Sequence, residues 1–299
     1  MPDKVVVGLV SRTFFNVPLW IAAANGLFAA EDLDVTTTIF GNASQVPPLL
    51  DGSFQFVVGS PEVAMQNAAA GGPLRLIAGN AGQLVHSLIA RAPFRRIEDL
   101  RGATIGILNM KEGTFFHIKT MLAAHGLTYP DDYTVKETGG VPPRHKALLE
   151  GTIDAGLQSV PWNFLAEDAG MHNLGAVTDY VPDWQFVSIN ANDAWAAANA
   201  DVVHRFLRAM LRGTQWLYAN RAASAAIAAR EMPVPLAHAE RAWDYFARTN
   251  ALTRDMSVNM AGLAKVIAVQ RDAGLLPADA PAEPSFYVNG RYLEAARGR

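Results

Sequence analysis

Cysteine is absent from this chain of 299 residues, and its absence excludes several kinds of site. Without thiols there are no disulfide bonds, thiolate zinc sites, iron–sulfur clusters or cysteine nucleophiles. The seven histidines are dispersed, and the closest two, His117 and His125, are eight residues apart. That separation is not typical of metal ligands, so we predict no metal site.

Long apolar runs and runs of like charge are also missing. Although 50% of the residues are hydrophobic, no stretch approaches the roughly 18 apolar residues of a membrane-spanning helix. The 25 basic and 28 acidic residues leave a net charge of −3, and no run of Lys or Arg exceeds two residues. We therefore expect no direct membrane insertion and no nucleic-acid partner, which leaves a small molecule as the expected ligand.

The common catalytic signatures do not occur either. The chain contains no H-E-x-x-H, G-x-S-x-G, G-x-G-x-x-G or G-x-x-x-x-G-K-[ST] segment. These absences disfavour zinc hydrolases, serine hydrolases and enzymes that hold nucleotides in glycine-rich loops. We expect no cofactor.

The length and the start of the chain bear on its organisation and location. At about 150 residues per domain, the length predicts two domains or lobes. Met1 to Lys4 lead directly into a strand-like segment, Val5–Val10, with no signal-peptide hydrophobic region before it. As the chain is written we expect a cytoplasmic protein; with a leader ahead of it, the protein would be periplasmic.

Short β-branched runs alternate with helical patterns through the first 190 residues, which is typical of βαβ units and mainly parallel sheets. Strands are expected at residues 5–10, 36–40, 54–58, 75–78, 84–90, 104–108, 134–137, 153–157 and 186–190. From Asp201 onward the apolar residues recur at helical spacing, so the C-terminal region is predicted to be helical. The expected fold class is α/β with two lobes.

Loops that follow strands in the first lobe are the first candidate sites, because ligands of open α/β sheets bind at the carboxyl ends of the strands. We predict ligand contacts there from Ser11, Arg12, Phe14, Asn42, Ser44, Ser60 and Asn80. Structural roles compete with these predictions. Phe14 is an ordinary core anchor in the alternative interpretation, Asn42 and Ser44 cap a helix, and Ser60 followed by Pro and Glu is already a complete capping signal.

The second lobe offers a similar strand-to-helix loop. Lys111, Gly113, Thr114 and Phe115 combine a charge, amide donors and an aromatic ring in one segment. The alternative for Lys111 is a solvated pair with the neighbouring glutamate. Trp162 follows the strand predicted at 153–157 and is expected to form a wall of the site, with core packing as its alternative.

Trp184 is a further aromatic residue that could stack on an apolar ligand body.

Several stretches, in this order, resemble one family. They are Pro18–Phe28, Asp51–Ala64, Ala68–Ala78, Asp99–Gly106 and Ala147–Ala155 with Pro161 just beyond. These segments are similar to the SsuA-like substrate-binding proteins, the sulfonate, nitrate and thiamine-precursor group of ABC transporters, and the likeness extends from Val5 to Asn190. The resemblance implies a type II periplasmic-binding-protein fold, in which two αβ lobes grip a ligand between them.

The resemblance also implies that the first lobe is discontinuous, and we place it at residues 1–84 and 188–299, with the second lobe at 85–187. Two features depart from relatives. The segment Asn109–Thr114 lacks the Gly-Ser step of many members, and the chain lacks the cysteines of the thiamine-pyrimidine synthases and of the sulfinate desulfinases. Both of these enzyme subclasses are therefore disfavoured.

The favoured function is a solute-binding protein that closes its lobes over a small organic acid, sulfonate or aromatic or heterocyclic compound. It would serve ABC-type uptake, with a membrane permease as partner, or sensing. The alternative is an enzyme on the same fold, a cofactor-independent decarboxylase or other lyase, with His86, His117 or Glu112 as its acid or base. Each histidine could equally be a buried, hydrogen-bonded residue, and a purely structural module is a third, less favoured class.

Overall fold

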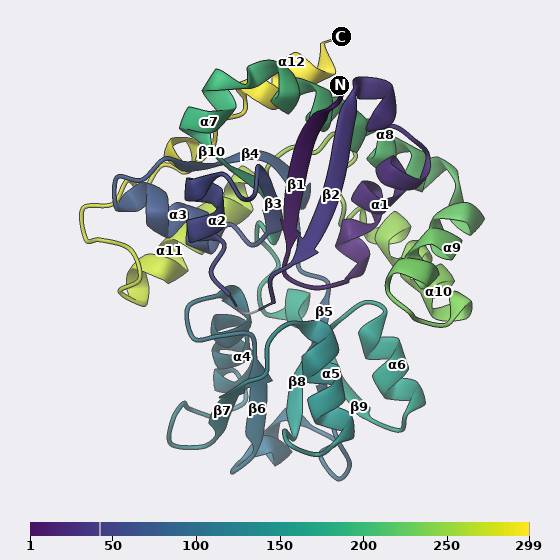
Figure 1. Ribbon diagram of the computed structural model, residues 1–299. Helices are drawn as coiled ribbons and strands as arrows, with labels where there is room; N and C mark the ends of the chain where they lie inside the picture. The colour runs from purple at the N-terminus through teal and green to yellow at the C-terminus, as the bar shows by residue number, and fades with distance from the viewer. Residues whose placement is uncertain (42, 299) are drawn as a thin grey trace. The chain divides into compact units, whose positions relative to one another are not determined.

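The computed structural model describes residues 1–41 and 43–298 (Figure 1). Its contacts divide the chain into two compact units: unit 1 is Met1–Gln83 with Trp184–Arg299, and unit 2 is Leu84–Asp183. Our sequence boundaries after residues 84 and 187 lie close to these two positions. The chain leaves unit 1 once and returns to it once, so unit 1 contains both ends of the chain.

Unit 1 contains a mixed five-stranded sheet with the order β2-β1-β3-β10-β4. Its strands are β1 (Asp3–Leu9), β2 (Leu33–Ile39), β3 (Phe56–Gly59), β4 (Leu74–Ala81) and β10 (Val187–Asn192). β1 is parallel to β2 and β3, whereas β10 is antiparallel to both β3 and β4. The strands β1 to β4 therefore share one direction, and the strand that returns from unit 2 runs against them.

Helices surround this sheet, and most of them come from the C-terminal part of the chain, as predicted. They are α1 (Val17–Ala24), α2 (Val46–Asp51), α3 (Glu62–Ala69), α7 (Asp193–Ala198), α8 (Ala200–Ala219), α9 (Arg221–Glu231), α10 (Leu236–Thr249), α11 (Met260–Asp272) and α12 (Arg291–Arg297). Phe206 of α8 joins the helix layer to the sheet. Its ring stacks on Phe56 of β3, with ring centroids 4.1 Å apart, and on Phe28, at 5.6 Å.

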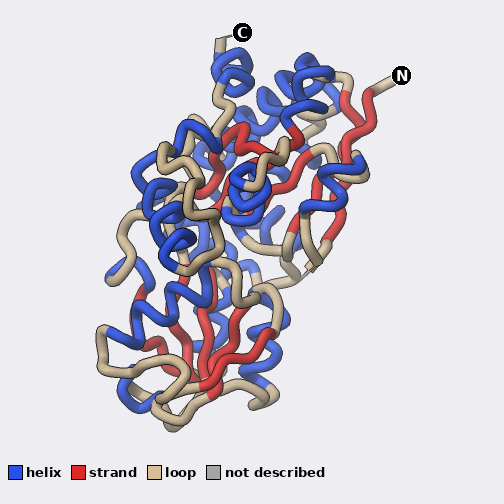
Figure 2. The backbone as a smooth tube through the Cα atoms, turned by 90° about the vertical axis from the view of Figure 1, so that its left-hand side faces the viewer, coloured by secondary structure: helices blue, strands red, loops and turns tan. Residues whose placement is uncertain are grey.

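Unit 2 repeats the same sheet pattern, with the order β7-β6-β8-β5-β9. Its elements are β5 (His86–Ala90), β6 (Thr104–Ile107), α4 (Gly113–Ala123), β7 (Thr134–Glu137), α5 (Val141–Leu149), β8 (Ala155–Ser159), α6 (Trp162–Asp168) and β9 (His172–Ala176). β6 is parallel to β7 and β8, and β5 is antiparallel to β8 and β9. Figure 2 shows the strands of this unit as one sheet flanked by helices.

Short 3-10 turns complete the structure. They lie at Phe14–Asn16, Ala29–Glu31, Ile97–Leu100, Val177–Asp179 and Pro284–Tyr287.

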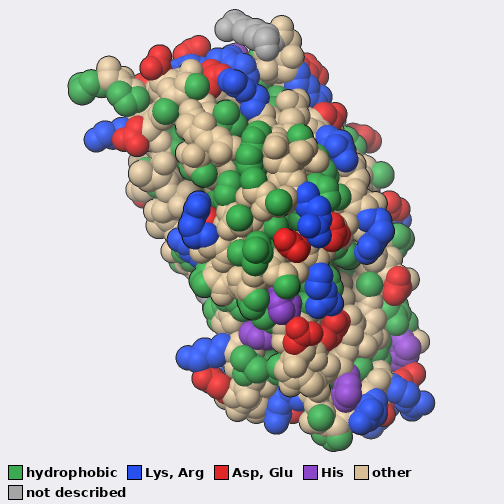
Figure 3. Space-filling view, turned by 90° about the vertical axis from the view of Figure 1, so that its right-hand side faces the viewer, with side chains coloured by type: hydrophobic (Ala, Val, Ile, Leu, Met, Phe, Trp, Pro, Cys, Tyr) green, Lys and Arg blue, Asp and Glu red, His purple; other side chains and the backbone are tan. Residues whose placement is uncertain are grey.

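Surface charges on one face alternate in sign. Figure 3 shows Lys and Arg side chains lying beside Asp and Glu there, without a continuous area of one charge. Some surface charges form ion pairs, such as Arg221 with Asp244, 2.7 Å apart between α9 and α10. Within residues 1–41 and 43–298, no helix has both the length and the apolar character needed to span a bilayer.

Candidate functional site

The carboxyl edge of the sheet in unit 2 collects the ends of several elements. β6, β7 and β8 are parallel and end at Ile107, Glu137 and Ser159. β5 begins at the same edge, because its first residue, His86, pairs with Ser159. α4 and α5 begin a few residues beyond β6 and β7, so their free N–H groups and positive dipole ends lie toward this edge. We call this region the unit 2 edge.

Arg144, in the first turns of α5, is a buried charge at the unit 2 edge. The side chain is 1% exposed; its Nε donates to the carbonyl oxygen of Leu157 at 2.7 Å and its Nη1 to that of Gly139 at 3.0 Å. Burial lowers the pKa of Arg144 from 12.5 to about 10, so the guanidinium is still charged at neutral pH. Among the described residues it forms no ion pair.

Two strand glycines make room for this arginine. A Cβ atom on Gly156 of β8 would lie 2.9 Å from Cδ of Arg144, and one on Gly106 of β6 would lie 3.1 Å from its Cγ. The side chain of Arg144 therefore packs against the face of the sheet at Gly106 and Gly156, where the strands carry no side chain. A side chain at either position would press on the aliphatic part of Arg144, and at Gly106 also on the Cδ1 atom of Ile153.

Unit 2 contains two buried histidines: His86, which lies near Arg144, and His117, which lies near His86. Burial first, and then the charges of Arg144 and His117, hold the pKa of His86 well below its ordinary value of 6.5. Burial lowers the pKa of His117, on α4, to about 3. Both rings are therefore neutral at physiological pH, and each can donate one hydrogen bond and accept another.

Buried polar atoms with unused hydrogen-bonding capacity lie at the end of β8. Gln158 is 0% exposed and Ser159 is 1% exposed. Within the described part of the chain, neither the Oε1 and Nε2 atoms of Gln158 nor the Oγ of Ser159 has a hydrogen-bond partner. Since a buried polar group without a partner costs about 1–3 kcal/mol, these atoms call for a functional explanation.

An aromatic pair stands beside them. The ring of His145, on α5, lies 5.3 Å from that of Trp162, the first residue of α6, with 57° between the planes. The indole Nε1 of Trp162 and the Nδ1 of His145 are buried and lack hydrogen-bond partners among the described residues. The two rings form an apolar surface that carries two polar atoms, Nε1 of Trp162 and Nδ1 of His145.

The other predicted residues of unit 2 divide between the surface and the helix start. Lys111 is exposed, and its backbone N–H donates to Asn109 at 2.8 Å. Gly113 begins α4, and the hydroxyl of Thr114 accepts the N–H of Leu108 at 3.2 Å. Glu112 is the N-cap residue of α4 but makes no side-chain capping bond.

Phe115 packs inside unit 2. It is 6% exposed and meets Tyr129 edge-on at 5.2 Å. These contacts describe a core residue, so its role in ligand binding stays a prediction.

At the corresponding carboxyl edge of unit 1, a set of buried polar groups satisfies itself. The hydroxyl of Ser188 donates to Asn190 at 2.8 Å. The amide of Asn190 donates to the carbonyl oxygen of Ser60 at 3.0 Å and to Gln45 at 3.3 Å. In contrast to Gln158 and Ser159, these side chains form hydrogen bonds within their own unit.

The predicted aromatic residues of unit 1 lie in its core. Phe14 is 0% exposed and stacks on Phe246 with centroids 4.6 Å apart, and Trp184 is 2% exposed. Asn80 is 2% exposed and donates to the carbonyl oxygen of Phe15 at 2.8 Å. All three residues therefore lie in the interior of unit 1.

Two further predicted residues of unit 1, Ser11 and Arg12, make contacts within that unit. Arg12 pairs with Glu231 at 2.9 Å. Ser11 is buried, and its carbonyl oxygen accepts a hydrogen bond from Asn16 at 2.8 Å.

Ser44 accepts the N–H of Val46 at 3.2 Å, which is the local turn that its structural alternative expected. Ser60 was expected to be the N-cap residue of the following helix. In the structure the N-cap of α3 is Pro61, one residue later. Asn42 lies outside the described residues.

Sequence analysis missed Arg144, His145 and Gln158. A signal for the first two was present: after the strand at 134–137, Gly139 to Pro143 form the same strand-to-helix junction that singled out the other loops, and Arg144-His145 follow directly. Gln158 is a polar residue at the end of a buried strand. In the described part of the chain, no group of three or more His, Asp or Glu residues could hold a metal ion.

The two sheets, each with one reversed strand, and the double crossing of the chain define the type II periplasmic-binding-protein fold. Comparison with solved structures agrees. The alkanesulfonate-binding protein SsuA from Xanthomonas axonopodis pv. citri, bound to MOPS, superposes with a TM-score of 0.75 at 17% identity, covering 97% of this chain and 99% of that one. The expected fold is confirmed.

The particular family follows from the sequence model of the NMT1/THI5-like family, which matches residues 15–224. The chain belongs to this family, and its resemblance to the SsuA-like group is confirmed. A Brucella abortus (strain 2308) protein named "Putative binding protein" is 28% identical over 286 residues, with 92% of this chain and 86% of the relative covered. The 4-amino-5-hydroxymethyl-2-methylpyrimidine phosphate synthase of Aspergillus parasiticus is 27% identical over 297 residues, with 89% of this chain and 81% of the relative covered.

Proposed function

We propose that this protein is the solute-binding component of an ABC-type importer, and that the unit 2 edge binds the acidic group of a small organic molecule. The observation that carries the proposal is the buried, charged Arg144, which has no carboxylate partner in residues 1–41 and 43–298. The family match and the names of the binding-protein relatives support the transport role. With that role goes a membrane permease as partner and, for a protein of this kind, a periplasmic location.

The acidic group is inferred from the energetics of Arg144. Removing a guanidinium from water is unfavourable, and attraction to an opposite charge offsets that cost only when the geometry is good. Two backbone carbonyl oxygens, of Leu157 and Gly139, compensate part of it. A carboxylate or sulfonate would supply the missing charge and form charge-assisted hydrogen bonds.

The rest of the ligand is inferred from the neighbours of Arg144. Gln158 and Ser159 supply hydrogen-bond donors and an acceptor. The rings of His86 and His117 are neutral, so they do not repel an anionic ligand. The pair of His145 and Trp162 would pack against a flat apolar body. An aromatic or heterocyclic acid combines these features.

The test uses taurine, benzenesulfonate, benzoate and nitrate as probes in thermal-shift assays, followed by calorimetry of the probe that stabilises the protein most. Arg144→Gln is expected to weaken its binding about 10- to 150-fold, the loss of one charged hydrogen-bonded contact. Lys146→Gln is the matched control, because Lys146 lies on the same helix, is exposed and pairs with Glu150 at 3.6 Å. Equal affinities in both variants would contradict the proposed site.

A second variant keeps the test valid if the loss of Arg144 disturbs folding. Gln158→Met keeps the side-chain volume but removes both polar atoms that lack partners. It is expected to raise the free energy of unfolding by about 1–3 kcal/mol without ligand and to weaken probe binding. A variant that is less stable than the wild type and binds the probe unchanged would show that Gln158 has a structural role.

The second candidate function is the lyase. Two observations favour it: a neutral histidine, His86, lies near a buried cation, Arg144, and the relative from Aspergillus parasiticus is named as a synthase. Mass spectrometry of the probe after long incubation separates the two functions. Recovery of intact probe supports binding, and product formation that His86→Gln abolishes would replace the binding proposal by catalysis.

A further inference from the structure

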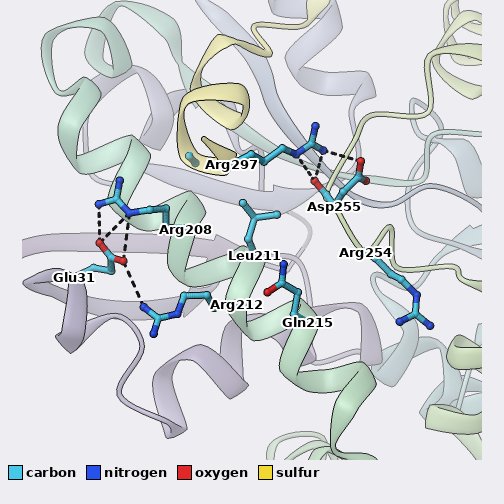
Figure 4. Close-up of a pocket in the computed structure, with 9 residues that line it drawn as sticks. Glu31, Arg208, Leu211, Arg212, Gln215, Arg254, Asp255 and Arg297 are labelled. Carbon is cyan, nitrogen blue, oxygen red and sulfur yellow. Dashed lines mark hydrogen bonds and ion pairs between the residues drawn. The ribbon is translucent and has the colours of Figure 1, made fainter. Parts of the chain in front are cut away.

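A second concentration of positive charge lies in unit 1, in a pocket of about 670 Å³. Arg208, Arg212 and Gln215 project into it from α8 (Figure 4). Their spacing of four and then three residues puts them on one face of that helix. The facing wall consists of Arg254 and Asp255 from the loop before α11 and Arg297 from α12 (Figure 4).

The pocket contains more positive than negative charge. Its four arginines face two carboxylates, those of Glu31 and Asp255. Glu31 binds Arg208 closely, with 2.7 Å between Nη2 and Oε2, and Arg212 loosely, with 3.7 Å between Nη1 and Oε1. Asp255 pairs with Arg297 at 3.0 Å. This excess stands against a net charge of −3 for the whole chain.

Two guanidiniums are therefore available for a ligand. Arg254 forms neither an ion pair nor a hydrogen bond with any described residue; its guanidinium stacks on the ring of Tyr218, 3.8 Å from the centroid. That stacking holds the guanidinium in place while its N–H groups remain available. The side chain of Arg212 is 55% exposed, and its one ion pair with a described residue is the long contact with Glu31.

We propose that this pocket binds a small organic molecule with acidic groups at two positions, one held by Arg212 and the other by Arg254. The volume lies within the range of about 300–1,000 Å³ that is usual for organic ligands and is much larger than a single inorganic anion needs. Arg212 and Arg254 stand on different walls, with Gln215 of α8 also lining the space (Figure 4). The two guanidiniums therefore suit two separate anionic groups better than one.

Calorimetry at low ionic strength with fructose 1,6-bisphosphate, fructose 6-phosphate and inorganic phosphate tests the proposal. The bisphosphate is expected to bind at least about tenfold more tightly than either of the other two, because only it can engage both arginines. Arg212→Gln and Arg254→Gln should each reduce this preference for the bisphosphate to about twofold or less. Arg248→Gln is the matched control, since Arg248 also lies over a tyrosine ring, 5.7 Å from the centroid of Tyr245, but does not line the pocket.

Three results would overturn the proposal. The first is no binding of the bisphosphate to the wild type at up to about 5 mM. The second is equal affinity for the bisphosphate and phosphate, and the third is an equal loss in Arg248→Gln. Arg144→Gln, in unit 2, should leave bisphosphate binding intact, which keeps this result independent of the site proposed for the transported solute.

Discussion

Acidification should destabilise this protein through the buried histidine of α4. The pKa of His117 is about 3 in the folded chain, against 6.5 for an ordinary histidine, because burial disfavours the charged ring. Between these two values the unfolded chain binds a proton that the folded chain does not, so the free energy of unfolding falls as the pH falls. From pH 7 to pH 5 His117 alone accounts for a loss of about 2 kcal/mol, at about 1.4 kcal/mol per unit of pH below 6.5. His86, whose pKa is lowered by burial and by Arg144, acts in the same direction.

Urea unfolding of the wild type and of His117→Gln at pH 7 and pH 5 measures this contribution. Glutamine cannot take up the proton, so the variant should lose about 2 kcal/mol less than the wild type over that interval. His172→Gln is the control, because His172 is only partly buried in the same unit. If His117→Gln and the wild type lose equal stability between the two pH values, His117 is not held neutral in the folded state and the reasoning fails.

Three substitutions in unit 1, followed by urea unfolding, separate its core from its surface. Phe14→Ala removes a fully buried, stacked ring and should cost about 3–5 kcal/mol; a loss below about 1 kcal/mol would contradict the packing. Arg12→Gln breaks the pair with Glu231, but Arg12 is 45% exposed, so a loss above about 1 kcal/mol would be unexpected. Gly79→Ala would bring a methyl group onto the carbonyl oxygen of Ser257, and the required backbone shift should cost about 1–3 kcal/mol; unchanged stability would show that the loop yields freely.

The order of elements could be predicted because each strand and helix has a local pattern. Thr134–Glu137 alternates and lies between turns, and the structure places β7 at the same residues. β9 was missed because His172–Ala176 contains Asn and Gly and no β-branched residue; its pairing with β5 holds it in the sheet. α7 was missed because it spans only six residues. In the structure the side chain of Asn192 caps this helix by accepting the N–H groups of Ala194 and Trp195.

The candidate site was harder to predict than the fold. Strand-end loops could be found from turn residues, which brought Lys111 and Trp162 into consideration. Which aromatic ring faces inward depends on tertiary packing, so Phe14 and Trp184 could not be separated from ligand-binding residues by sequence alone. The junction before α5 marked the loop that leads to Arg144, but the burial of its side chain could not be predicted, because it depends on glycines in two strands distant from it in sequence.

Those glycines give the strongest reason to assign Arg144 a role in function. Glycine within a strand lowers stability, and burying a charge without a counter-charge is unfavourable as well. At the unit 2 edge both costs occur together, since Gly106 and Gly156 leave the space that the aliphatic part of the buried Arg144 side chain occupies. Selection for stability alone would favour an apolar side chain at position 144 over this arrangement. The acidic ligand that we propose would restore the charge balance and account for the occurrence of these three residues together.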